Sequence, residues 1–160
     1  MNTSTKSISG LNKEKAGELA NELNKLLANY QVFYQNVRGF HWNIRGEKFF
    51  ELHVKFEELY DDLLLKIDEI AERIVTLGRV PLHAWSEYLA VSEIKEVQNI
   101  TNGSEGARKI LESFLVLLGM QRKLLDLSAE AGDEGTNALM SDYIREQEKM
   151  AWMYDAFLNN

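Results

Sequence analysis

Two pairs of side chains, each spaced four residues apart, are the residues of this chain whose types could bind a metal ion. His53 and Glu57 form the first pair, and Asp68 and Glu72 form the second. Residues four apart lie one turn from each other on the same side of a helix, so each pair can point at one ion. Imidazole and carboxylate ligands without a thiolate suit iron or manganese, although zinc could also compete. Spacing alone leaves open the alternative of solvated or hydrogen-bonded pairs.

The two pairs are too far apart to serve one ion within a single helix. His53 and Asp68 are 15 residues apart, which is about 22 Å along a straight helix. Antiparallel packing of two copies of this helix about a two-fold axis would bring His53 and Glu57 of one chain beside Asp68 and Glu72 of the other, and would do so twice. The spacing therefore predicts two symmetric sites, each shared between two chains.

The remaining histidines and one further acid of this region receive different interpretations. His41 ends the preceding helix, and a short turn could bring it next to His53 as a ligand from the same chain. Asp61 is interpreted as a surface charge or an interface hydrogen-bonding residue rather than a ligand. His83, which follows Pro81 closely, is interpreted as structural or exposed.

The apolar pattern predicts the helices that must position these residues. One amphipathic helix is expected from residue 12 to residue 41 or 42, because apolar residues recur there every three or four positions. A second helix is expected over 47–76, a third over 104–131 and a fourth over 136–158. The connection 79–102 is long and carries a short helix near 84–90. A crossover of this length favours an all-α four-helix bundle with one long connection.

Composition limits the protein classes to consider. The chain has 160 residues, of which 45% are hydrophobic, and contains one proline and no cysteine. The missing cysteine excludes disulfides, cysteine nucleophiles and thiolate metal sites. No apolar run approaches the roughly 18–20 residues that a membrane span needs, so we expect a cytoplasmic protein. We expect one domain over 11–160, preceded by a flexible tail over 1–10.

Residues 36–81 closely resemble the Dps family, the mini-ferritins named as DNA-binding proteins from starved cells. The similarity includes the pattern HWN-x-RG-x-x-F-x-x-LH from His41 to His53 and the pattern D-E-x-A-E-R from Asp68 to Arg73. The helical plan and the chain length extend the resemblance to 11–158. The resemblance implies a ferritin-like bundle assembled as a hollow shell of twelve subunits.

The resemblance also implies a ferroxidase site between two-fold-related subunits. His41, His53 and Glu57 would come from one chain, and Asp68 and Glu72 from the other. The implied activity is oxidation of ferrous iron, preferably by hydrogen peroxide, followed by storage of ferric mineral, which protects the cell from oxidative damage. Many members have aspartate where this chain has Glu57, so its role as a direct ligand stays open.

One aromatic residue beside this site has two possible roles. Trp42 follows His41 directly in the sequence. Its indole is apolar bulk for core packing by residue type alone. In the family it would lie near the ferroxidase site and could act as a sacrificial electron donor.

A group of acids near the turn between the third and fourth helices is the candidate for an iron entry pore. Asp126 and Glu130 lie near the carboxyl end of the third helix, where a negative charge is unfavourable, so a function is the better explanation for them. Family resemblance places this region at negatively charged three-fold pores. Asp133 and Glu134 precede the fourth helix, where acids are favourable anyway, and rank below the first two.

The alternative function is that of a DNA-condensing nucleoid protein with weak or vestigial iron chemistry. Lys6, Lys13 and Lys15 are the basic residues at the start of the chain. A shell of twelve chains would carry twelve times the net charge of −7, which opposes contact with phosphates. Twelve tails could still act together. We expect no strong DNA binding at neutral pH. A helical interaction module without chemistry would leave the histidine and carboxylate pairs unexplained.

Overall fold

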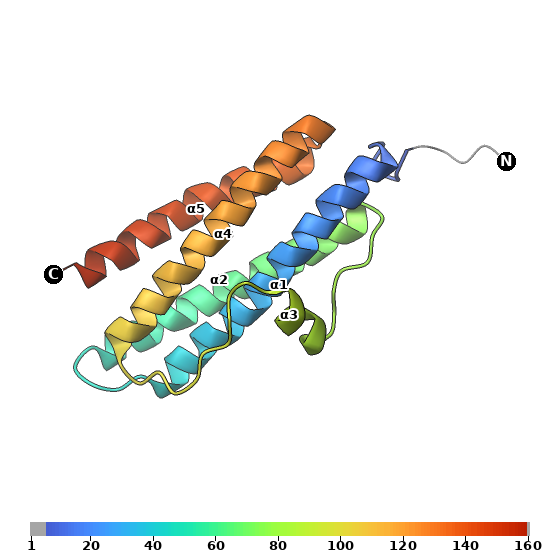
Figure 1. Cartoon of the computed structure of the whole chain (residues 1–160). Coiled ribbons are helices and arrows are strands. Elements are labelled where there is room, and N and C mark those ends of the chain that lie inside the picture. Colours follow the sequence, from blue (N-terminus) through green and yellow to red (C-terminus); the bar gives the residue numbers. More distant parts are fainter. Residues whose placement is uncertain (1–5, 160) are drawn as a thin grey trace.

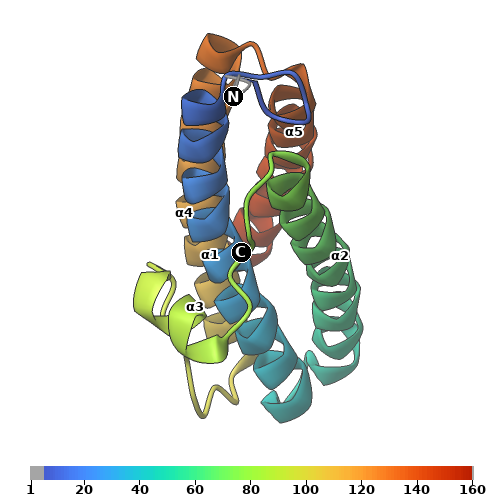
Figure 2. The same cartoon turned by 90° about the vertical axis from the view of Figure 1, so that its right-hand side faces the viewer.

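Five helices make up the regular structure of residues 6–159, the part of the chain that this computed structural model describes. They are α1 (Lys13–Asn43), α2 (Phe49–Thr76), α3 (Trp85–Val91), α4 (Gly103–Ala131) and α5 (Glu134–Leu158). The four long helices form a bundle, and α3 lies against the outside of α1 (Figures 1 and 2). The predicted all-α four-helix bundle, with a short helix in its crossover, is confirmed.

Side-chain caps fix where the helices begin, because the first backbone N–H groups of a helix have no partner within it. The Asn12 side chain accepts hydrogen bonds from the backbone of Glu14 and Lys15 at the start of α1. The Asn102 side chain caps α4 in the same way, because its Oδ1 accepts a hydrogen bond of 2.9 Å from the Glu105 backbone nitrogen. At the end of α4, Gly132 takes a left-handed conformation with φ of 68°, which a glycine adopts without steric cost.

The core lies between the apolar faces of the four long helices. Helices α1 and α2 pack as one antiparallel pair and α4 and α5 as another, with α1 and α4 joining the pairs. Phe33 of α1 meets Phe114 of α4 edge-on, with ring centroids 5.3 Å apart. Phe40 of α1 meets Phe56 of α2 at 6.3 Å. Aromatic pairs of this kind each add about 0.5–1.5 kcal/mol beyond the area they bury.

Helices α2 and α5 are joined by polar side chains. The buried ammonium of Lys66 is 2.8 Å from Asp62 of its own helix and 2.7 Å from Glu146 of α5. Burial alone would lower the pKa of Lys66, but hydrogen bonds to both carboxylates raise it, so the side chain stays charged. The Tyr143 hydroxyl donates to Glu69 at 2.5 Å. These contacts fix the separation of α2 and α5.

Three asparagines of α1 hold the crossover, whose backbone has little regular structure to satisfy its polar groups. The Asn29 side-chain oxygen accepts hydrogen bonds from the backbone nitrogens of Glu93 and Ile94, at 3.1 and 2.9 Å. Asn24 accepts from the backbone of residue 82, and Asn36 bonds the backbone of residues 95 and 97. The crossover is therefore attached to α1 at three levels of the bundle.

The start of the chain shows a turn before α1. Within the expected tail, residues 1–5 lie outside the described residues. Ser7 and Leu11 are linked by a backbone hydrogen bond of 2.8 Å, and Lys6 pairs with Asn12 in an isolated bridge. The flexibility of residues 1–10 stays a prediction. Within residues 6–159, no helix is both long enough and apolar enough to cross a membrane.

Candidate metal centre

His41 and His53 lie face to face where α1 and α2 meet. Their ring centroids are 3.7 Å apart and their planes are inclined by 15°. His41 is buried in the last turn of α1, and His53 is partly exposed in the first turns of α2. The short connection 44–48 between the two helices therefore does what the sequence predicted, and brings His41 next to His53.

Two reciprocal hydrogen bonds fix the orientation of both rings. Nδ1 of His41 is 2.6 Å from the backbone oxygen of His53, and Nδ1 of His53 is 2.9 Å from the backbone oxygen of His41. A carbonyl oxygen only accepts hydrogen bonds, so Nδ1 must carry the hydrogen in both rings. In the neutral imidazole the lone pair is then on Nε2, which is the atom left to bind a metal ion. The site is thus oriented before any ion binds.

Aromatic rings enclose the histidine pair, and sequence reasoning missed them. Phe49 stacks on His53 with ring centroids 5.0 Å apart, and Tyr60 meets His41 edge-on at 5.3 Å. Loss of water contact and then the neighbouring carboxylates of Glu57 and Asp61 raise the pKa of Tyr60, so its phenol is protonated at neutral pH. The spacing of these residues could have revealed them, because residues 49 and 60 lie one turn before and two turns after His53 on the same side of α2.

The acids of the predicted site share one exposed face of α2 with large apolar side chains. Glu57, Asp61, Asp68 and Glu72 are all exposed. The exposed apolar side chains of the same helix are Phe50, Val54, Leu64, Leu65 and Val75. With His53 at zero and 100° per residue, all nine fall within an arc from about 20° to about 120°. We call this arc the outer face of α2.

The structure of one chain brings together only part of the predicted ligand set. His41 and His53 are in contact, and Glu57 lies one turn further along α2. Asp68 and Glu72 lie near the opposite end of the helix, which runs from Phe49 to Thr76. Within residues 6–159 of a single chain, no three histidine or acidic side chains are grouped so that they could hold an ion. Asp68 and Glu72 can join His53 only from another chain.

The centre of the bundle around Tyr30 is occupied by neutral polar groups. Bundles that hold two metal ions in their core do so with inward carboxylates and histidines. Here the buried Tyr30 hydroxyl accepts hydrogen bonds from the amides of Gln121 and Gln147, and Gln121 donates to Gln147 at 2.8 Å. Burial raises the pKa of Tyr30, which keeps this network uncharged. The outer face of α2 is therefore the better candidate for a metal centre.

Trp42 lies beside the site but turns its indole toward an arginine. The indole is 56% exposed, and the Arg38 guanidinium lies over it at 4.7 Å from the ring centroid. The same guanidinium is 5.4 Å from the ring centroid of Tyr34. Tyr34 in turn meets Tyr60 edge-on at 6.1 Å. An aromatic series thus leads from His41 through Tyr60 to Tyr34.

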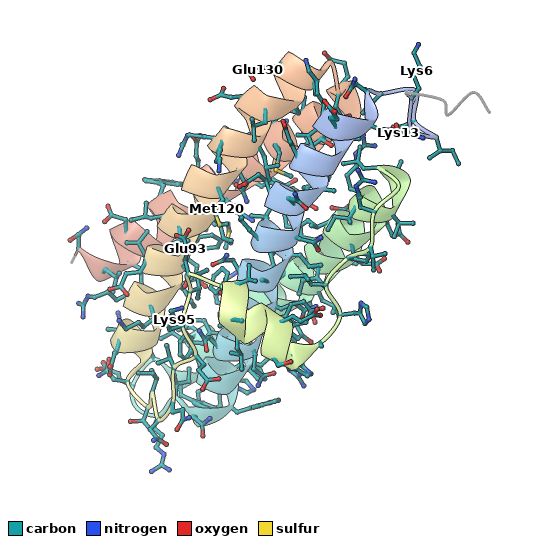
Figure 3. The ribbon with its side chains drawn as sticks, turned by 45° about the vertical axis from the view of Figure 1, so that its right-hand side comes forward. Lys6, Lys13, Glu93, Lys95, Met120 and Glu130 are labelled. Atoms are coloured by element: carbon teal, nitrogen blue, oxygen red, sulfur yellow. The ribbon has the colours of Figure 1, made fainter. Side chains whose placement is uncertain are left out.

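The four acids of the predicted pore differ in their surroundings. Asp126, Glu130 and Glu134 are exposed at the end of the bundle where α4 gives way to α5, and Glu130 shares that end with Lys6 and Lys13 (Figure 3). Asp133 is only 3% exposed. It caps α5 through the Thr136 nitrogen and pairs with Arg73 at 2.5 Å. The structure gives Asp133 a capping role, and we leave it out of the pore proposal.

The start of α1 also faces this end of the bundle. The Lys15 ammonium is 2.8 Å from the backbone oxygen of Glu130. A cation at the carboxyl end of a helix interacts favourably with the helix dipole. Lys15 therefore offsets part of the cost of the acids there.

The amino-acid sequence is similar to those of known proteins over most of its length. A family model described as a ferritin-like domain matches residues 20–160. The DNA protection during starvation protein of Porphyromonas gingivalis is 41% identical over 150 residues, which cover 94% of each chain. An uncharacterized protein from Haemophilus influenzae is 51% identical over 152 residues, or 95% of each chain.

A solved structure is similar over nearly the whole chain. It is a Dps protein from Vibrio cholerae O1, described as a member of a broad superfamily of ferritin-like diiron-carboxylate proteins. The two structures superpose with a TM-score of 0.97 at 54% sequence identity, covering 99% of this chain and 100% of the other.

Proposed function

The chain belongs to the Dps family of ferritin-like proteins, and from this premise we propose that it is a ferroxidase that stores iron. Ferrous iron is the substrate, and hydrogen peroxide is the preferred oxidant. His41, His53 and Glu57 of one chain bind the iron together with Asp68 and Glu72 of a second chain. The ferric product is stored as mineral inside a shell of twelve chains in the cytoplasm, and this protects the cell from oxidative damage.

The reciprocal hydrogen bonds between His41 and His53 are the observation that carries this proposal. They direct the lone pair of each Nε2 away from the protein backbone and leave it to a ligand. A histidine pair with only a structural role would have no need of a face of α2 that is both acidic and apolar beside it. That outer face supports burial against a second copy of the chain, because exposed apolar side chains concentrate at interfaces.

The proposed ligands explain why the bound iron is oxidised from the ferrous to the ferric state. Anionic carboxylates stabilise a triply charged ion more than a doubly charged one, so they favour oxidation of the bound iron. Two ferrous ions each give one electron to hydrogen peroxide. With two protons, the peroxide becomes two water molecules, and no hydroxyl radical is released. Zinc or manganese could occupy the same ligands without carrying out this oxidation, and would then inhibit it.

Iron entry requires a path through the shell. Asp126, Glu130 and Glu134 are exposed at one end of the bundle, where copies around a three-fold axis would form an acidic ring. A ring of carboxylates attracts divalent cations and concentrates them at the pore. In this proposal the pore supplies ferrous iron, and hydrogen peroxide oxidises the iron bound at the site that two chains share.

The proposal is tested by adding hydrogen peroxide to the anaerobic protein loaded with ferrous iron. Ferric absorbance reports how many irons are oxidised per peroxide. The proposal predicts two irons per peroxide and a rapid phase that the double substitution His53→Ala, Asp68→Ala removes.

A control that also removes one histidine and one carboxylate is His83→Ala with Glu51→Ala. Both of these residues are exposed, and neither lies on the outer face of α2. The control should oxidise iron at the rate of the unchanged protein. Equal rates for the first double variant and the unchanged protein would show that the site is assigned wrongly.

A further inference from the structure

The ring of Phe49 lies flat against His53, on the face of the imidazole that is turned away from His41. The centroids of Phe49 and His53 are 5.0 Å apart, and their planes are inclined by 24°. His41 stacks on the same imidazole with ring centroids 3.7 Å apart. Two rings within stacking distance on a single face of one imidazole would overlap each other, so the ring of His53 lies between them. This histidine is therefore held on both faces.

The hydrogen bond that His53 makes fixes only one edge of its ring. Its Nδ1 is 2.9 Å from the backbone oxygen of His41, and the torsion that rotates an imidazole about its Cβ–Cγ bond has broad minima. A contact at one nitrogen leaves the ring free to swing about that contact, and this moves Nε2, which lies across the ring. Flat contact on both faces prevents the movement. The stack and the hydrogen bond together fix the direction of Nε2.

Phe49 is itself held in place by the way α2 begins. It is the first residue of α2, and its backbone nitrogen donates a hydrogen bond of 3.1 Å to the backbone oxygen of Gly46. Gly46 has φ of 103°, which a residue with a side chain rarely adopts. Phe49 packs against the core and lies one turn before His53 on the same side of the helix. The connection between α1 and α2 therefore places the phenyl ring against the imidazole.

We propose that Phe49 is a positioning residue that holds Nε2 of His53 in the direction needed for metal binding. The inference rests on the proposed ferroxidase function. In that function Asp68 and Glu72 come from a second chain, so the orientation of His53 must come from its own chain. An imidazole that is oriented in advance loses little freedom when an ion binds, which lowers the ferrous concentration that fills the site.

An apolar packing role and a stacking role for Phe49 differ in the substitutions that they tolerate. Leucine is apolar and packs against the core, but it offers no flat face to the imidazole. Tyrosine keeps the flat ring, and the partial exposure of Phe49 leaves room for a hydroxyl. Phe49→Leu therefore removes the stack, and Phe49→Tyr is its matched control. Phe49→Met is a second variant without a ring, because its flexible side chain fills irregular space.

The test measures metal binding and iron oxidation on the full-length, assembled protein. Co²⁺ alone is the binding probe, because its visible absorption depends on the groups that coordinate it and the titration needs no oxidant. The variant His53→Ala identifies the part of the absorption that belongs to the site. Size-exclusion chromatography and thermal unfolding show that each variant assembles and folds. Iron oxidation by hydrogen peroxide is then followed over a range of ferrous concentrations.

We expect Phe49→Leu and Phe49→Met to weaken Co²⁺ binding by about ten- to 100-fold, and Phe49→Tyr to stay within about twofold of the unchanged protein. In the two variants without a ring, the ferrous concentration that gives half the maximal rate should rise by a similar factor. The rate at saturating iron should change little, because the ligands of the occupied site are the same.

An assembled Phe49→Leu or Phe49→Met variant that binds Co²⁺ as tightly as the unchanged protein overturns the inference and leaves the ferroxidase function standing. Equal weakening in Phe49→Leu and Phe49→Tyr overturns it too, since the loss would then follow any change at this position. An unchanged protein that neither binds Co²⁺ at His53 nor oxidises iron refutes the ferroxidase function, and the inference with it.

Discussion

Replacing Asn29 with alanine should detach the crossover from α1 and destabilise the bundle. The Asn29 side chain is fully buried and accepts hydrogen bonds from the backbone nitrogens of Glu93 and Ile94. It also accepts one from the Ser92 hydroxyl. Alanine leaves two backbone donors of the crossover without an acceptor, and each buried unsatisfied donor costs about 1–3 kcal/mol. Because the Glu93 donor is only partly buried, we expect a loss of about 2–4 kcal/mol in the free energy of unfolding.

Urea denaturation followed by circular dichroism measures this loss. All variants are compared at one protein concentration, because association adds to apparent stability. The matching decrease in Tm is roughly 5–15 °C for a chain of this length. Hydrogen exchange should also speed up at the amides of Glu93 and Ile94 before it does in α1.

Asn24→Ala is the matched control. It removes the same kind of side chain from the same helix, but its bonds to the crossover are exposed or only partly buried, so water can replace them. We expect a loss below about 1 kcal/mol. Equal losses in Asn29→Ala and Asn24→Ala, or exchange at Ile94 unchanged in Asn29→Ala, would refute the reasoning from burial.

Three further predictions address the ends of the chain and the pore. Asp133→Ala should lower Tm more than Asp133→Asn, since asparagine still caps α5 while both changes unpair Arg73; equal losses would argue against the cap. Asp126→Asn with Glu130→Gln should slow iron uptake at low ferrous concentration while peroxide stoichiometry is unchanged, measured by stopped-flow absorbance; an unchanged rate would remove both from the pore. Gel shifts at neutral pH and moderate salt should show no strong DNA complex, whereas retardation that Lys6→Ala abolishes would show that the tail binds DNA.

The helices of this fold could be predicted from the sequence because their apolar residues recur without interruption. The predicted bounds of α2, α3 and α4 lie within a residue or two of Phe49–Thr76, Trp85–Val91 and Gly103–Ala131. Few glycines and one proline interrupt the chain, so each helix ends where the periodic pattern ends. The closeness of His41 and His53 was also predictable, because only a short connection joins their helices.

Contacts between distant residues were beyond sequence reasoning. Asp133 carries a charge that is typical of an exposed acid, and its burial depends in part on its pairing with Arg73, 60 residues away. Lys66 lies at the edge of the charged face of α2, yet it is buried, since Glu146 of α5 provides a second carboxylate. The contact of Tyr60 with His41 depends on the angle between α1 and α2. Such pairings follow from the packing of helices, which periodicity within one helix does not specify.

The shared site is the central claim, and mixing two inactive variants tests it most directly. Chains with His53→Ala and chains with Asp68→Ala are co-expressed with different tags, and mixed assemblies are isolated. Where the two variants pair, one of their two sites lacks both residues and the other is complete. A matched control mixes His53→Ala with His41→Ala, which leaves no pair of chains with a complete site.

The rate of peroxide-driven iron oxidation by the mixed assemblies shows whether the site is shared between chains. If sites are shared across a two-fold axis and chains pair at random, about a quarter of all sites are complete. The account predicts that the His53→Ala and Asp68→Ala mixture recovers about a quarter of the rapid phase of the unchanged protein, while each variant alone and the control mixture stay inactive. A mixture that assembles normally and oxidises iron no faster than its parents would contradict the shared site.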